Sequence, residues 1–195
     1  MNQPQLAQFC DRPAEQVAPE LLGAALLVDG VGGIVVETEA YEPNDPASHS
    51  FGGRTTRNAA MFGPPAHAYV YRSYGIHWCF NVVCRRGSAV LVRALEPRWG
   101  VEAMMERRGT RIATLLAAGP GRLTQALAIS RDHDGLPLGE GVLELDPQPA
   151  IQAIATGPRI GISKATDRPW RFGLAGSAYL SRPMAARARP EAGRQ

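Results

Sequence analysis

The chain has 195 residues, of which 45% are hydrophobic and 20% charged, as is typical of a globular domain that buries a core without metal or disulfide support. Its longest apolar run, Leu21–Val28, is too short for a membrane span, which needs about 20 residues, and the N-terminus lacks the pattern of a signal peptide. The three cysteines have no zinc-type spacing, so we expect reduced thiols in a cytoplasmic protein, or in a nuclear one if the source is a eukaryote.

Charge is unevenly distributed along the chain. Residues 54–98 carry seven arginines against one glutamate, and residues 159–195 carry eight cations against two acids. Two basic blocks of this kind indicate a surface that faces a polyanion, although a solvated face in an arginine-rich chain would have the same composition. Lys164 is the single lysine, so a mechanism based on a lysine Schiff base has one side-chain candidate.

The hydrophobic pattern predicts short helices and strands that follow one another irregularly. Apolar residues have helical spacing in three segments: 13–28, 99–108 and 122–129. β-branched or alternating patterns predict strands in seven segments: 34–38, 68–72, 79–84, 89–95, 142–145, 159–163 and 170–174. Residues 85–88 join the third and fourth of these as an antiparallel hairpin.

The remaining segments indicate how the chain is organised. Residues 42–67 are rich in glycine and proline and predict a long loop, of the kind that is often functional. No repeat or linker divides the chain, so we expect one α+β domain over residues 1–195, with a curved, largely antiparallel, barrel-like β-sheet flanked by helices. The basic segment 184–195 is predicted to be a disordered tail.

Two carboxylates lie at the end of the first predicted strand. If segment 34–38 continues as a strand toward Tyr41, then Glu37, Glu39 and Tyr41 share one face. Arg93 lies on an otherwise apolar strand and needs an anionic partner there. A glutamate held near an arginine can activate a water molecule. A purely structural ion pair between neighbouring strands would produce the same pattern.

Aromatic residues follow the long loop. Tyr69 and Tyr71 fall on one face of a predicted strand, and Tyr74 lies in a turn-like Ser-Tyr-Gly sequence from which a ring would project. A projecting ring beside a basic loop suits insertion between base pairs, whereas tyrosines on strands often simply belong to cores. Asn81, between two apolar residues, is a candidate for a buried polar side chain that could read a base edge.

The sequence offers little support for a metal or a cofactor. Its four histidines have no metal-ligand spacing, and the loop Gly52–Asn58 lacks the ending of a nucleotide-binding phosphate loop. We therefore expect no metal and no cofactor, and we interpret this loop as a segment that binds nucleic-acid phosphates.

The same residues closely resemble the alkyladenine (3-methyladenine or methylpurine) DNA glycosylase family. The resemblance runs from about residue 15 to 182 and is carried by Glu37-Thr38-Glu39-Ala40-Tyr41, Ala47-Ser48-His49, Thr56-Arg57-Asn58, Tyr69-Val70-Tyr71, Tyr74-Gly75, Asn81 and Arg93-Ala94-Leu95-Glu96-Pro97. Weaker matches continue through Arg159-Ile160-Gly161-Ile162 and Arg171-Phe172.

The resemblance implies a role for each matched residue. Glu39 would activate the water that attacks C1′ of the sugar, while Arg93 and the backbone carbonyl of Ile160 would help to hold that water. The other roles are implied in the same way: Tyr41, His49 and Tyr71 would line the pocket around a flipped base, Asn81 would exclude the 2-amino group of guanine, Tyr74 would fill the gap in the duplex, and Arg57 would bind a phosphate.

The implied activity is that of a monofunctional DNA glycosylase. It would excise alkylated or deaminated purines (3-methyladenine, 7-methylguanine, hypoxanthine, ethenoadenine) from double-stranded DNA without a lyase step, as a monomer that needs no protein partner and no membrane. Three alternatives stay open at this point: a non-catalytic module that binds damaged DNA, a metal-dependent nuclease built on Glu37, Glu39 and Asp45, and a bifunctional glycosylase and lyase that uses Lys164.

Overall fold

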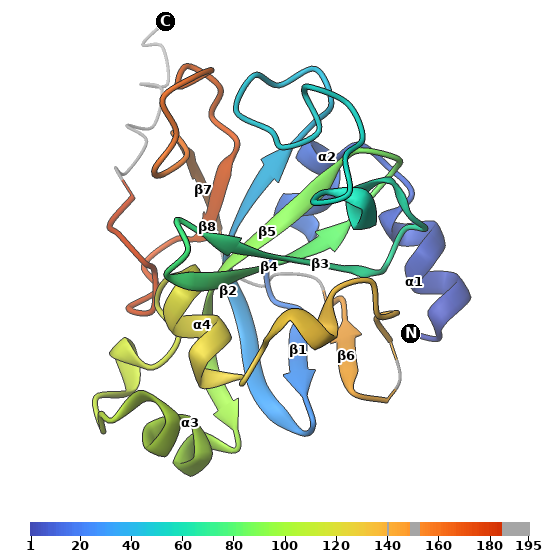
Figure 1. Ribbon diagram of the computed structural model, residues 1–195. Coiled ribbons are helices and arrows are strands. Elements are labelled where there is room, and N and C mark those ends of the chain that lie inside the picture. The colour runs from blue at the N-terminus through green and yellow to red at the C-terminus, as the bar shows by residue number, and fades with distance from the viewer. Residues whose placement is uncertain (140, 149–152, 185–195) are drawn as a thin grey trace, which may run out of the picture.

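The computed structural model describes residues 1–139, 141–148 and 153–184. Within them the chain forms one α+β domain, in which helices surround a curled antiparallel sheet of half-barrel shape (Figure 1). The helices are α1 Gln3–Cys10, α2 Ala14–Glu20, α3 Val101–Arg108 and α4 Pro120–Ala126, with 3₁₀ turns at Ala59–Phe62, Ala113–Leu115 and Arg131–His133. The strands are β1 Ala25–Val28, β2 Val31–Tyr41, β3 Ala68–Ser73, β4 His77–Val83, β5 Ala89–Trp99, β6 Leu143–Asp146, β7 Ile154–Gly157 and β8 Arg171–Leu174. The expected fold class is confirmed.

Strand β2 organises the sheet. The main order of strands is β3-β4-β5-β2-β1-β6, and β8, which pairs with β7, joins the sheet through β2. One edge of β2 pairs with β5 along its length, while the other edge pairs first with β1 over Val31–Ile34 and then with β8 over Glu37–Glu39. Because β2 is enclosed in this way, its carboxyl-terminal half is buried, including both glutamates.

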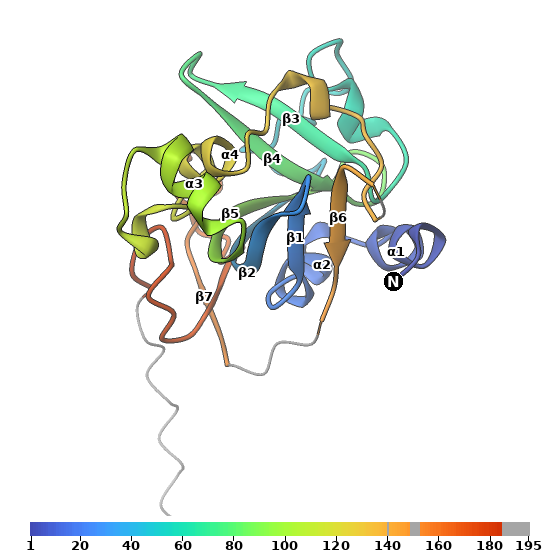
Figure 2. The same cartoon turned by 90° about the horizontal axis from the view of Figure 1, so that it is seen from below.

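All four helices of the described segments contribute buried residues to the same hydrophobic core as the sheet. Figures 1 and 2 show α1 on one side of the molecule and the pair α3 and α4 on the other, with β3 and β4 arching over the middle. Helix α2 packs against β2, and the hydroxyl of Thr38 donates a hydrogen bond of 2.8 Å to the carbonyl of Ala18 in α2. Thr38 therefore points to the helix-covered core, which leaves its neighbours Glu37 and Glu39 to point to the opposite face, as the predicted alternation required.

Alternation along three strands separates the core from an open concave face. The core receives Ala68, Val70, Phe80, Val82, Val90, Val92 and Ala94. The residues between them line a cavity on the other face: Tyr69, Tyr71 and Ser73 of β3, His77, Cys79 and Asn81 of β4, and Ala89, Leu91 and Arg93 of β5. The period of two along each strand thus produces both the hydrophobic core and the wall of the site.

Two predicted elements are wrong. The helix expected over 13–28 ends at Glu20 as α2, and Gly23, with a φ of 90°, turns the chain into strand β1. Helical spacing suggested one continuous helix, but β1 pairs on both of its edges, with β2 and with β6, and this tertiary pairing decides its structure. Helix α1, which precedes it, was not predicted.

The strand expected at 159–163 is likewise absent from the described sheet. Gly161 has a left-handed φ of 77°, and the N–H of Ile160 donates to a side chain rather than to a neighbouring strand. The strand in this region is instead β7, at residues 154–157, which pairs with β8.

Other elements agree with the sequence pattern within a few residues. The hairpin of β4 and β5 is confirmed, with Asn81 opposite Leu91 and Val83 opposite Ala89. The loop 42–67 contains only one 3₁₀ turn, and the predicted disordered tail at 184–195 lies, apart from Met184, outside the described residues. None of the helices in the described segments is long and apolar enough to span a membrane.

Candidate active site

A cavity of about 750 Å³ occupies the concave face of the sheet. Its walls come from β3, β4 and β5, from the loop after β2 and from the segment Ile160–Lys164. Of the nine residues predicted to form the site, eight line this cavity: Tyr41, His49, Arg57, Tyr71, Tyr74, Asn81, Arg93 and Ile160. The ninth, Glu39, is fully buried and contacts three of the cavity residues.

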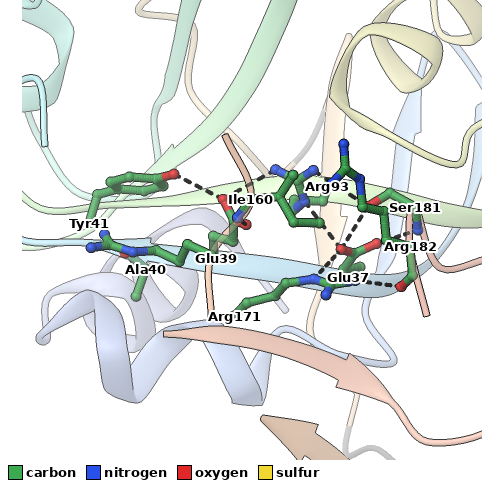
Figure 3. Close-up of polar contacts among 10 residues, drawn as sticks. Glu37, Glu39, Ala40, Tyr41, Arg93, Ile160, Arg171, Ser181 and Arg182 are labelled. Atoms are coloured by element: carbon green, nitrogen blue, oxygen red, sulfur yellow. Dashed lines mark hydrogen bonds and ion pairs between the residues drawn. The ribbon is translucent and has the colours of Figure 1, made fainter. Parts of the chain in front are cut away.

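Glu39 is held from three directions. Its Oε2 accepts hydrogen bonds from the hydroxyl of Tyr41 at 2.9 Å and from Nη1 of Arg93 at 3.2 Å, and its Oε1 accepts one from the backbone N–H of Ile160 at 2.8 Å (Figure 3). All three donors line the cavity, so the carboxylate of Glu39 lies directly behind the cavity wall. The expected contribution of the carbonyl of Ile160 remains a prediction, because the observed contact is made by its N–H.

Burial and these contacts act on the pKa of Glu39 in opposite directions. Desolvation raises it, while the charge of Arg93 and the hydrogen bonds from Ile160 and Tyr41 lower it, and burial prevails. Burial also works against the charge of Arg93, but Glu39 and Glu37 outweigh it, so the pKa of Arg93 is raised. The site therefore combines a carboxylate of increased basicity with a permanent positive charge beside it.

Glu37 forms the structural half of this network. It accepts hydrogen bonds from Nε of Arg93 at 3.2 Å, from Nε of Arg171 at 2.7 Å, and from both the N–H and the hydroxyl of Ser181 at 2.5 and 2.8 Å (Figure 3). Two glutamates and two arginines thus balance one another in a buried cluster, which avoids the large penalty of an unpaired buried charge.

A β-bulge in strand β5 includes Arg93. The pairing of β2 with β5 steps from Glu37 opposite Ala94 to Thr38 opposite Val92, so Arg93 is an extra residue on β5. Its carbonyl accepts a hydrogen bond of 3.0 Å from the N–H of Gly119 instead of pairing with β2. Bulges re-aim side chains in this way and often lie beside active sites. The sequence predicted the ion pair, which is confirmed, but not the bulge.

The aromatic wall is a compact group of rings. The rings of Tyr69 and Tyr71 stack with centroids 5.4 Å apart, and His49 meets Tyr71 edge to face at 4.5 Å. Nδ1 of His49 shares a hydrogen bond of 2.9 Å with the hydroxyl of Tyr69. Burial, together with the charge of Arg57, lowers the pKa of His49, so the ring is neutral at physiological pH. The wall therefore presents uncharged faces and edges suited to a flat, electron-poor ring.

Asn81 is fixed in the floor of the cavity. It is buried on β4, and its Nδ2 donates a hydrogen bond of 2.9 Å to the carbonyl of Tyr69 on the neighbouring strand. A side chain anchored in this way cannot move aside easily, so it can exclude a bulky group by its position.

Three residues, Tyr74 to Ile76, connect β3 and β4, and Tyr74 and Gly75 are the two central residues of the turn. Tyr74 has a φ of 49° and Gly75 a φ of 69°, and the N–H of Ile76 bonds to the carbonyl of Ser73 at 2.9 Å. Positive φ at both central positions corresponds to the tight hairpin turn that suits twisted strands. The side chain of Tyr74 is 83% exposed, so a strained turn presents a large ring to solvent at the mouth of the cavity.

Cations lie at the rim of the same cavity. Arg57 is exposed, and its Nη2 donates a hydrogen bond of 3.3 Å to the carbonyl of Arg72 on β3. Asn58, next to it, donates to the carbonyls of His49 at 2.8 Å and Gly53 at 3.0 Å, which orders the loop. Lys164, the single lysine of the chain, also lines the cavity.

Sequence reasoning missed the residues that support this site. Arg171 and Ser181 hold Glu37, and Asp45 forms an ion pair with Arg159 in which both side chains are fully buried. An isolated arginine on a predicted apolar strand is the pattern that could have identified Arg159 and Arg171. Only for Arg93 did this pattern lead to a predicted ion pair. The same contacts weaken the nuclease alternative, because each of its carboxylates, Glu37, Glu39 and Asp45, is occupied by an arginine.

The cavity is lined by aromatic rings, has cations at its rim and lies next to a buried carboxylate. This combination is typical of an enzyme that acts on a nucleobase. Comparison with known proteins agrees: the family described as methylpurine-DNA glycosylase (MPG) matches residues 8–178. Three bacterial proteins are each named "Putative 3-methyladenine DNA glycosylase". That of Rhizobium meliloti is 62% identical over 174 residues, 89% of this chain and 94% of the relative. Those of Rhodopseudomonas palustris (strain HaA2) and Nitrosospira multiformis are each 58% identical, covering 94% and 86% of this chain and 93% and 89% of the relatives.

The chain belongs to the methylpurine-DNA glycosylase family. It is therefore a DNA glycosylase, a hydrolase whose substrate is DNA and whose activity belongs to base excision repair.

Proposed function

We propose that this protein is a monofunctional glycosylase that flips alkylated or deaminated purines out of duplex DNA and releases them by attack of water at C1′. The proposed substrates are 3-methyladenine, 7-methylguanine, hypoxanthine and ethenoadenine, and the proposed product is an abasic site. The protein would act as a monomer, without a metal or another cofactor.

The observation that carries this proposal is the environment of Glu39. Its carboxylate is buried next to Arg93 and is oriented by Tyr41 and the N–H of Ile160, and all three of these residues line the cavity. A water bound there loses its proton to Glu39 as it attacks the sugar. The negative charge of Glu39 also stabilises the positive charge that develops on the sugar as the glycosidic bond breaks.

The cavity would receive the extruded base. Tyr41, His49 and Tyr71 line it with ring surfaces, and stacking on a side-chain ring contributes about 1–3 kcal/mol per base. Extrusion from a duplex costs a few kcal/mol, less for a damaged or mispaired base, so the cavity recovers most of this cost for a base that is already weakly paired.

Selection among bases would rest on Asn81 and on the backbone near His49. Asn81 is fixed by its bond to Tyr69 and would clash with the 2-amino group of guanine. The backbone N–H at His49 would favour an acceptor at purine position 6, as in hypoxanthine, over the amino group of adenine.

The residues at the mouth of the cavity would handle the DNA. Tyr74 would occupy the space that the flipped nucleotide leaves in the stack, and Arg57 would bind a backbone phosphate.

Single-turnover base release tests the proposal. A duplex with one hypoxanthine or one ethenoadenine is incubated in EDTA with the wild type and with Glu39→Gln, and abasic sites are detected by alkaline cleavage. We expect the wild type to release the base and Glu39→Gln to lose about 10²–10⁴-fold in rate, the usual contribution of a general base. Glu144→Gln, an exposed glutamate of β6, is the matched control and should retain the wild-type rate.

The pH profile adds a second criterion. Burial raises the pKa of Glu39, and only the ionised carboxylate can accept a proton from water, so the rate should fall as the pH drops through this raised pKa. The acid limb of the wild type should therefore lie above the ordinary range of a glutamate, and the residual rate of Glu39→Gln should lack this limb.

Other outcomes would redirect the proposal. Binding without release of hypoxanthine, ethenoadenine or 3-methyladenine would indicate a module that only binds damaged DNA. Strand scission that EDTA abolishes would indicate a nuclease. A covalent complex trapped by borohydride in the wild type and absent in Lys164→Arg would indicate a lyase step.

A further inference from the structure

We propose that Arg159 and Asp45 form a buried positioning pair that sets the geometry of Glu39 from both sides of its carboxylate. The inference rests on the proposed role of Glu39 and adds two residues to the machinery, neither of which lines the cavity itself. Both act through the groups that contact Glu39.

Arg159 lies between the two segments that hold Glu39. It forms an ion pair with Asp45 in which both side chains are fully buried, and Nη2 of Arg159 lies 3.0 Å from Oδ1 of Asp45. Its Nη1 donates a hydrogen bond of 2.9 Å to the carbonyl of Ala40. Its guanidinium carbon lies 4.7 Å from the centre of the ring of Tyr41 and 5.4 Å from the centre of the ring of Trp170.

Each of these contacts leads directly to Glu39. Ala40 is the residue between Glu39 and Tyr41, so a bond to its carbonyl fixes the backbone that carries both side chains. Tyr41, against which the guanidinium stacks, donates its hydroxyl to Oε2 of Glu39. Ile160 follows Arg159 in the chain and donates its N–H to Oε1 of Glu39. One arginine thus determines the positions of the donors to both carboxylate oxygens.

Asp45 extends this arrangement to the loop that carries His49. Its Oδ1 accepts a hydrogen bond of 3.1 Å from the N–H of Ala47, and its carbonyl accepts one of 2.8 Å from the N–H of Ser48. The ion pair therefore ties the loop before His49 to the segment after β7, and both segments contribute residues to the cavity wall.

The energetics of the pair favour a positioning role over a purely stabilising one. A buried ion pair is often no more stabilising than apolar residues of the same volume, because both charges must be desolvated. In addition, the buried Nε of Arg159 has no hydrogen-bond partner among the described residues, which carries a further penalty. The fork of Arg159 nevertheless reaches three acceptors at once, at Asp45, Ala40 and Ala165, which apolar residues could not do.

Loss of the pair should be visible in the titration of Glu39. The N–H of Ile160 and the hydroxyl of Tyr41 stabilise the ionised form, so loosening these bonds makes that form less favourable and shifts the titration to higher pH. The other titratable or charged groups around Glu39 are unchanged by the substitutions below: Glu37 of β2, Cys79 of β4, Arg93 of β5 and Arg171 of β8.

The experiment measures the carboxyl ¹³C titration of Glu39 in the protein without DNA, with the resonance assigned from its loss in Glu39→Gln. Two variants are compared with the wild type. Arg159→Lys keeps the positive charge opposite Asp45 but loses the planar guanidinium group with its several donors. The double variant Asp45→Leu with Arg159→Met replaces the buried ion pair by apolar side chains. Arg108→Met is the matched control, because Arg108 also bonds a backbone carbonyl, that of Leu116, but its hydrogen bonds go to Leu116 and Gln125 rather than to the residues that hold Glu39.

We expect the midpoint of Glu39 to rise by about one pH unit in both variants, the size that follows from losing one hydrogen bond to a charged group, and to stay unchanged in Arg108→Met. Single-turnover base release should fall at least about tenfold, with its acid limb displaced by the same amount. A midpoint equal to that of the wild type in either folded variant would overturn the inference, as would unfolding of both variants, which would make the pair structural. The titration does not depend on base release, so a wild type that releases no base would refute the proposed function and still leave the midpoint to decide the role of the pair.

Discussion

The exposed ring of Tyr74 allows DNA insertion to be separated from folding. Tyr74 is 83% exposed and has a φ of 49°, so its side chain contributes little to the core while its backbone is strained. We expect Tyr74→Ala to lose the ring that inserts into the DNA but to keep the strained left-handed backbone. Tyr74→Gly should lose both the ring and the backbone strain. The two variants should therefore be equally impaired on DNA and should differ in stability.

The magnitudes follow from these two contributions. Stacking of a ring on a base is worth about 1–3 kcal/mol, so apparent affinity for a lesion duplex should fall roughly 5–150-fold in either variant. A left-handed backbone costs a non-glycine residue about 1–2 kcal/mol, while glycine adds about 0.5–1 kcal/mol of unfolded-state entropy. The free energy of unfolding of Tyr74→Gly should therefore exceed that of Tyr74→Ala, by up to about 1.5 kcal/mol.

Single-turnover kinetics on two substrates provide the assay. The concentration dependence of hypoxanthine release is measured on a duplex and on the same strand without its complement, where no stack has to be opened. The defect of both variants should be confined to the duplex. An equal loss on both substrates, or a large fall in the unfolding midpoint of Tyr74→Ala, would refute the reasoning and make Tyr74 a structural residue.

Two further predictions concern selection and DNA binding. Asn81→Ser should raise release of normal guanine at least about tenfold, because the group that meets its 2-amino substituent is shortened; unchanged guanine release on undamaged duplex would remove Asn81 from this role. Arg57→Ala should weaken duplex binding regardless of sequence and lower the slope of log affinity against log salt by about one. The control is Arg98→Ala, because Arg98 does not line the cavity, and it should keep the wild-type slope. Equal slopes in a salt titration of the wild type and both variants would argue against a phosphate contact of Arg57.

Local pattern was sufficient for much of the fold. The strands around Tyr69, Asn81 and Arg93 were predictable because alternation of apolar and polar residues is a property of each strand alone. The segment 25–28 was not, because a short apolar run is compatible with helix or strand, and only its pairing with β2 and β6 decides between them. The segment around Gly161 was predicted to be a strand because it is apolar. Its isoleucines line the cavity instead of packing in the sheet.

The composition of the site was also largely readable. An unpaired buried charge is strongly unfavourable, so a glutamate and an arginine on apolar strands are expected to form an ion pair. This reasoning predicted the pairing of Arg93 with the carboxylates from the sequence. The resemblance to glycosylases then assigned Tyr41, His49 and Tyr71 to one base pocket with Asn81 near it, and these four residues line one cavity. Tyr74, which the resemblance assigned to the gap in the duplex, lines the same cavity.

What the sequence determined by itself is the set of chemical groups and the faces on which they lie, because charge, ring character and strand alternation are properties of residues and their spacing. Only the tertiary structure decided how these groups are held. The bulge at Arg93, the contacts of Ser181 with Glu37 and the pair of Arg159 with Asp45 join residues 54 to 144 positions apart. Such contacts depend on how distant segments pack, and no local pattern encodes the register or the direction that packing imposes.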